Sequence, residues 1–133
     1  MPTVARHADP AGFERGLRAF FEYRDLGVQG ETAGGYGAHV IRAIPGEHAE
    51  AKWHCHRLDF QFVVVLRGWV RFEYEDIGEV LLQAGSTVLQ PPMVKHREVE
   101  HSDDLELIEI TAPAEFETLL VEPPGATPGT HPA

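Results

Sequence analysis

From residue 36 onward the chain alternates short apolar runs with clusters of turn-forming residues, and this pattern limits the folds open to it. The runs are rich in β-branched and aromatic residues, which favour strands. They are YGAHVIRAI (36–44), AKWHCH (51–56), QFVVVL (61–66), WVRFEYE (69–75), EVLLQ (79–83), TVLQP (87–91), KHREVE (95–100) and DLELIEIT (104–111). Breaks such as PGEH, DIG and HSDD separate them. Many short, closely spaced strands of this kind predict an all-β sandwich or barrel.

The segments before and after this pattern differ from it in composition. Residues 1–12 are polar, with prolines and a glycine, and we expect them to form a flexible arm. The stretch FERGLRAFFEY (13–23) fits a short amphipathic helix weakened by Gly16, and it fits an edge strand equally well. Residues 123–133, PPGATPGTHPA, are rich in Pro and Gly and are expected to be disordered. We therefore expect one barrel domain over residues 13–122.

Charge and cysteine content argue against several classes of partner. The chain carries 21 acidic against 11 basic residues, a formal net charge of −10. Such a balance repels phosphate backbones and anionic lipid surfaces, so we expect neither nucleic acid nor a membrane as partner. Cys55 is the single cysteine, which excludes an intrachain disulfide and fits a reducing compartment. The N-terminus shows no signal-peptide pattern, so a cytoplasmic protein is expected.

Two histidines, His54 and His56, stand two positions apart in the run AKWHCH. Residues i and i+2 of a strand share a face, so both imidazoles would point the same way. Gln61 has the opposite parity, and it joins them only if the intervening RLD (57–59) bends and starts a new strand. His96, after the QPPMV turn, offers a third imidazole. The sequence alone leaves two readings open, a metal site and a histidine-rich strand that binds nothing.

An N3O set of this kind has a definite chemical character. Imidazole suits Zn, Cu, Fe, Ni and related ions, whereas an amide oxygen is a weaker ligand than a carboxylate. Neutral ligands alone would leave the full +2 charge of the ion uncompensated. Such a centre would favour an anionic ligand or a metal-bound hydroxide.

Two longer stretches of the chain resemble the paired sequence motifs of the cupin family. Residues 54–68, HCHRLDFQFVVVLRG, match the first motif at His54, His56 and Gly68. Residues 85–96, GSTVLQPPMVKH, match the second motif at Gly85, Pro91 and His96. Gln61 stands where the family has an acidic ligand, and Met93 stands where the second motif has glycine.

The resemblance implies a double-stranded β-helix, a jelly-roll barrel of two packed sheets. It also implies one divalent metal ion, Fe, Mn, Ni, Zn or Co, held by His54, His56, Gln61 and His96. The family includes dioxygenases, isomerases, lyases and decarboxylases, so the fold does not select a reaction. A three-His, one-Gln set is similar to that of small cupins acting on sugar acids. A homodimer is a further expectation from the family.

Glu98 is the candidate for a catalytic acid or base. It shares strand parity with His96, as does Glu100, so its carboxyl would face the cavity. A solvated position at the barrel rim is the alternative. His101, in EHSDD, is expected to be a turn residue.

Together these features predict a small metal-binding cupin that binds or acts on a small polar or anionic molecule. A sugar-acid-like or carbonyl compound would suit the site. The alternatives are a non-catalytic binding or sensing cupin and a cupin with a degenerate site and a structural role.

Overall fold

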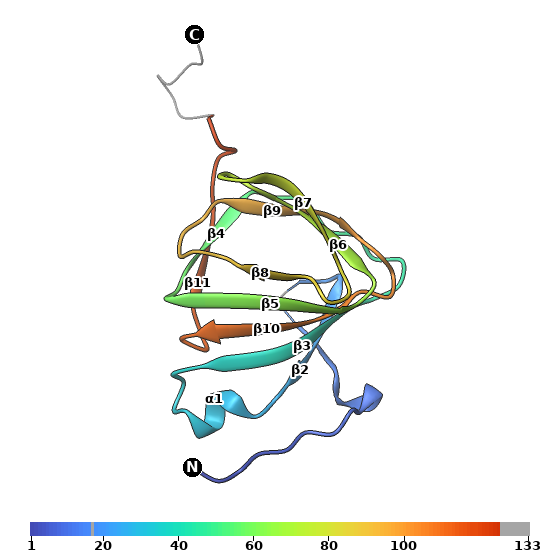
Figure 1. Ribbon diagram of the computed structural model, residues 1–133, viewed down its shortest axis with the longest axis vertical. Helices are drawn as coiled ribbons and strands as arrows, with labels where there is room; N and C mark the ends of the chain where they lie inside the picture. The colour runs from blue at the N-terminus through green and yellow to red at the C-terminus, as the bar shows by residue number, and fades with distance from the viewer. Residues whose placement is uncertain (17, 126–133) are drawn as a thin grey trace.

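The computed structural model describes residues 1–16 and 18–125, and strands make up most of its regular structure (Figure 1). The helical elements are a 3-10 helix (Pro10–Gly12) and α1 (Val28–Glu31). The strands are β1 (Glu14–Arg15), β2 (Phe21–Asp25), β3 (Gly37–Ala43), β4 (His54–Arg57), β5 (Phe60–Arg67), β6 (Trp69–Tyr74), β7 (Gly78–Gln83), β8 (Thr87–Leu89), β9 (His96–His101), β10 (Glu106–Ala112) and β11 (Glu117–Leu120). Neither helix in the described ranges is long and apolar enough to cross a membrane.

The strands form two antiparallel sheets that lie one above the other in Figure 1. The larger sheet has the order β1-β2-β3-β10-β5-β8, and the smaller has the order β11-β4-β9-β6-β7. From β3 onward, consecutive strands mostly alternate between the two sheets, as they do in a jelly roll. The predicted all-β fold, a double-stranded β-helix, is confirmed.

The interior of the barrel changes from apolar to polar along the strands. Side chains of alternate residues share a face, so every second residue of β5 and β10 points inward. In order, the inward cross-strand pairs are Val65–Leu107, Val63–Glu109 and Gln61–Thr111. The buried hydrophobic core lies at the valine end: Phe20, Phe21, Ile41, Ala43, Val63, Val65, Val70, Leu82, Leu105 and Leu107. The other end is therefore free to hold polar groups.

The N-terminal segment forms a hairpin in which β1 pairs with β2, and β2 joins the larger sheet through β3. The edge-strand alternative for residues 13–23 is correct, and the helix alternative is wrong. Pairing with β3 buries Phe21 and half-buries Tyr23, which a short isolated helix could not do. Gly16 is needed here because a Cβ at this position would collide with the Tyr23 ring.

Two further segments bear on the predicted boundaries. Strand β11 was not expected from the sequence, and it pairs with β4 at the edge of the smaller sheet. The expected arm, residues 1–12, is exposed and carries only the 3-10 helix. Residues 126–133 of the expected disordered tail lie outside the described residues.

Candidate metal centre

Three histidines converge on the inner face of the smaller sheet. His54 and His56 lie on β4, and His96 begins β9 directly opposite His54 in register. One ring nitrogen from each lies within 4.8 Å of the corresponding atoms of the other two. All three are buried, with 5%, 8% and 3% of their surface exposed. The structure thus brings three of the predicted ligands together in a group that could hold a metal ion.

Hydrogen bonds at Nδ1 hold the ring of each histidine in place. His54 Nδ1 lies 2.8 Å from the carbonyl of Lys52, and His96 Nδ1 lies 3.0 Å from the carbonyl of Val94. A carbonyl only accepts, so both Nδ1 atoms carry the proton and leave the Nε2 lone pair free in the neutral ring. Contacts of this kind orient metal-binding histidines.

His56 is held in a different way, by a side chain rather than by the backbone. Its Nδ1 lies 2.9 Å from Oγ1 of Thr118 on β11. A hydroxyl can donate or accept, so this contact fixes the ring position and leaves the tautomer open. The unpredicted strand β11 therefore supplies a group that supports a predicted ligand.

The barrel interior keeps the three imidazoles neutral. Burial is the main cause that lowers the pKa of His56 from 6.5 to about 3, and the nearby rings of His96 and His54 contribute to the same shift. Burial also lowers the pKa of His96 to about 4. The pKa of His54 falls for the same reason, against the opposing effect of its bond to Lys52. Neutral imidazole is the form that binds metal ions.

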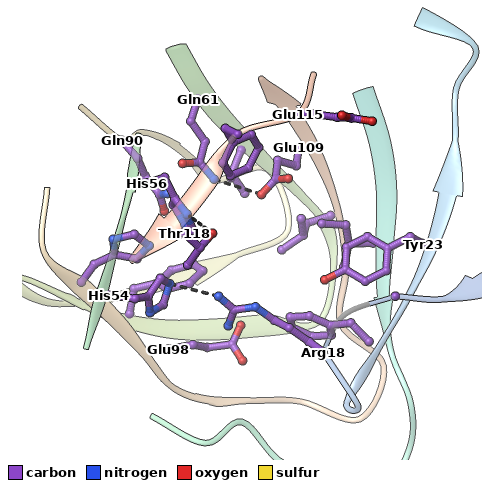
Figure 2. A pocket seen from close by; sticks show the side chains of 18 of the residues that line it. Arg18, Tyr23, His54, His56, Gln61, Gln90, Glu98, Glu109, Glu115 and Thr118 are labelled. Atoms are coloured by element: carbon purple, nitrogen blue, oxygen red, sulfur yellow. Dashed lines mark hydrogen bonds between the residues drawn. The ribbon is translucent and has the colours of Figure 1, made fainter. Parts of the chain in front are cut away.

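Gln61 faces the histidines from β5, and the structure shows how its amide is oriented. Strand β4 ends at Arg57 and β5 starts at Phe60, so the expected bend does separate Gln61 from the histidine pair. Its Nε2 donates to Glu109 Oε2 at 3.0 Å. The amide oxygen therefore points away from Glu109, toward the side of His56 (Figure 2). Burial raises the pKa of Glu109, and the bond from Gln61 opposes that rise.

These side chains line a cavity of about 400 Å³ between the two sheets. This volume suits a small molecule. Apolar walls such as Val63 and Leu107 alternate with polar groups that reach inward. The polar lining, apart from the histidines and Gln61, consists of Arg18, Tyr23, Gln90, Glu98, Glu109, Glu115 and Thr118 (Figure 2).

Comparison with known proteins identifies the family. The sequence model of the cupin domain matches residues 40–111, more than half of the chain. The chain belongs to the cupin family. The matched range contains all four predicted ligand positions of this cupin, and its donor set of three imidazoles and an amide fits a divalent first-row metal ion.

Solved structures share the fold at low sequence identity. KdgF from Halomonas sp. has a TM-score of 0.62 and 16% identity, over 77% of this chain and 88% of that one. A Streptomyces PAC13 variant with uridine has a TM-score of 0.65 and 14% identity, over 89% of this chain and 92% of that one. Fe(II) HppE has a TM-score of 0.61 and 20% identity, over 80% of this chain and 60% of that one. No curated protein matches the sequence of this cupin. Likeness at these identities shows the fold and leaves the reaction open.

Glu98 lines the cavity of this cupin, as its parity predicted, and is buried. Its carboxylate lies 3.1 Å from His101 Nδ1. The prediction that His101 is a turn residue is wrong, because it ends β9 with its side chain buried. A register shift between β6 and β9 inserts an extra residue after Glu98. That bulge turns Glu100 outward and His101 inward, so the parity rule fails beyond Glu98.

Three residues that contact the candidate ligands were missed by the sequence reasoning. Arg18 lies between β1 and β2, in a segment whose structure the sequence left open. Thr118 lies on β11, where no strand was expected, so no pattern indicated it. Glu109 had a usable signal, since it alternates with Leu107 and Thr111 along an expected strand.

Proposed function

We propose that this cupin binds one divalent transition-metal ion through His54, His56, His96 and Gln61, and acts on a small polar or anionic molecule in the cavity. The observation that carries the proposal is the set of three buried, neutral imidazoles with their Nδ1 atoms bonded to protein groups. The rings of His54 and His96 are held as the Nδ1–H tautomer, which leaves their Nε2 lone pairs to a metal ion or, at His54, to the Arg18 guanidinium. The metal-binding reading is therefore preferred to the structural one.

The bound ion would supply Lewis acidity and a template for an oxygen ligand. Fe, Mn, Ni, Zn and Co are all compatible with an N3O set. Gln61 contributes no charge; the carboxyl group of Glu109 lies one hydrogen bond behind the amide, and the Arg18 guanidinium lies 3.0 Å from His54 Nε2. An anionic or strongly polar oxygen ligand complements a centre built this way.

Glu98 is the residue we propose for proton transfer to or from the bound molecule. It faces the cavity from β9, two residues after the ligand His96. His101 holds its carboxylate in place from the apolar side, where it packs against Phe20 and Phe21. A carboxylate fixed beside a substrate pocket is placed for general acid–base chemistry on a sugar acid or a carbonyl compound.

A binding or sensing module is the second candidate function, and one observation favours it. Each cavity glutamate already has a protein partner: Glu98 has His101, Glu109 has Gln61, and Glu115 has Gln29. Carboxylates engaged in this way are less available as bases. Such a cavity would recognise a ligand without transforming it.

Metal content is the first test. Protein prepared without a histidine tag should contain about one divalent ion per chain by elemental analysis, and His54→Ala and His96→Ala should each remove it. His48→Ala is the matched control, because His48 is exposed and lies outside the cavity. Substoichiometric metal that His54→Ala leaves unchanged would refute the metal site.

Turnover separates the two candidate functions. The metal-loaded protein is incubated with aldonic acids, uronic acids and simple diketones, with and without a chelator. We expect conversion of a member of this set, lost on chelation and restored by metal. Tight, metal-dependent binding with no conversion would favour the sensing module.

A further inference from the structure

Arg18 reaches into the cavity from the turn between β1 and β2, and its side chain points toward the histidines (Figure 2). Its Nη2 donates to His54 Nε2 at 3.0 Å. A guanidinium only donates, so this contact independently requires a lone pair on Nε2, in agreement with the bond from Nδ1 to Lys52. Residue 18 lies outside the range matched to the cupin domain, residues 40–111. The arginine is therefore supplied by the N-terminal hairpin of this chain.

Arg18 lacks a carboxylate partner within residues 1–16 and 18–125. None of the ion pairs in this part of the chain includes it, and its guanidinium carbon lies 5.8 Å from the centre of the Phe20 ring. The three glutamates of the cavity are bonded elsewhere, to His101, Gln61 and Gln29. A half-buried cation without a counter-ion is costly, so an anion from outside the chain would stabilise it.

Metal binding would increase the need for an anion beside Arg18. His54 Nε2 is both the acceptor for Arg18 and the donor atom proposed for the metal. An ion on that lone pair removes the hydrogen bond and places two positive charges next to each other. A carboxylate between them satisfies both, since it can ligate a metal and accept the paired N–H groups of a guanidinium.

We propose that Arg18 anchors the carboxylate of the ligand at this centre, so that the cavity selects small carboxylic acids with a second oxygen donor. The inference rests on the proposed metal site and names the substrate class for it. Arg18 is thus the specificity-determining residue, and a neutral analogue that keeps the metal-binding oxygens gains nothing from it.

The test compares glycolate with its neutral analogue glycolamide on the Co²⁺-loaded full chain, with the visible absorption bands of Co²⁺ as the readout. Wild type should prefer glycolate. Arg18→Met should weaken glycolate binding by about ten- to hundredfold, the range for a hydrogen bond between charged groups, and leave glycolamide binding within about twofold. Arg18→Lys keeps the charge and should retain part of the preference. Arg67→Met is the matched control, since Arg67 is an exposed cation outside the cavity.

A second readout needs no ligand. In buffer free of carboxylates, Arg18→Met should bind Co²⁺ about tenfold more tightly than wild type, because His54 Nε2 is no longer engaged. Equal glycolate and glycolamide affinities in wild type, or an unchanged preference in both Arg18 variants, would overturn the proposal. A wild-type protein that fails to bind Co²⁺ would instead overturn the proposed function itself.

Discussion

Acid should destabilise the metal-free protein through its buried histidines. His56 has a pKa of about 3 in the folded chain and an ordinary value of 6.5, and His96 has a folded value of about 4. The folded state therefore binds fewer protons than the unfolded state between these values. Stability from these groups is complete above pH 6.5 and is lost as the pH falls toward the folded pKa.

The size of the effect follows from the same values. Each pH unit below 6.5 lowers the free energy of unfolding by about 1.4 kcal/mol for each histidine that is neutral in the folded state and protonated in the unfolded state. At pH 5 that is about 2 kcal/mol for each of His56 and His96, or about 4 kcal/mol together. Glu109 acts in the opposite direction, because its raised pKa favours folding in acid. A loss of this size is a large fraction of the stability of a small domain, which is about 5–15 kcal/mol.

Urea unfolding of chelator-treated protein at pH 7 and pH 5 measures this difference. The contribution of one group is isolated by His56→Gln, which should reduce the loss between the two pH values by about 2 kcal/mol relative to wild type. His48→Ala, at an exposed position, should leave the loss unchanged. If wild type and His56→Gln lose the same stability on acidification, the buried neutral state of His56 is wrong.

Other predictions follow from single contacts. Thr118→Val should weaken metal affinity, measured by calorimetry, by about two- to tenfold, because His56 Nδ1 loses a hydrogen bond that water can partly replace at this exposed residue. Thr118→Ser, which keeps the hydroxyl, should restore the affinity. Glu109→Leu frees the Gln61 amide to rotate and should lower metal affinity by about tenfold or more, while an unchanged affinity would contradict a ligand role for Gln61. Val65→Ala should cost about 2 kcal/mol in urea unfolding at the apolar end and leave metal stoichiometry unchanged.

Local periodicity was sufficient to predict the strands from β3 to β10 and the shared face of His54 and His56. His54 and His56 are two residues apart, and strand geometry alone places side chains at that spacing on one face. The RLD bend was also readable, because Gln61 otherwise has the wrong parity. The resemblance to the cupin motifs then supplied His96, which is distant in sequence and adjacent to His54 only through strand pairing.

Contacts that depend on long-range pairing were not predictable in this way. Arg18 reaches His54 across 36 positions, and Thr118 reaches His56 across 62. His101 was placed in a turn on the composition of EHSDD, but pairing with β6 extends β9 to this residue, and the bulge that turns it inward depends on the β6–β9 pair. The expected homodimer stays a prediction, as does Glu98 as the catalytic residue.

The amide at position 61 is best understood together with its neighbour. A carboxylate at this position would place a negative charge directly on the proposed metal ion, whereas Gln61 keeps the carboxyl group of Glu109 one hydrogen bond away, where burial raises its pKa. The proposed ion would then keep more of its positive charge toward the cavity, which Arg18 also lines. Two centres of positive charge facing one cavity would together create a stronger preference for an anion than either would alone. The substitution of the acidic ligand, and an arginine that has no carboxylate partner among the described residues, thus support the same proposed class of ligand.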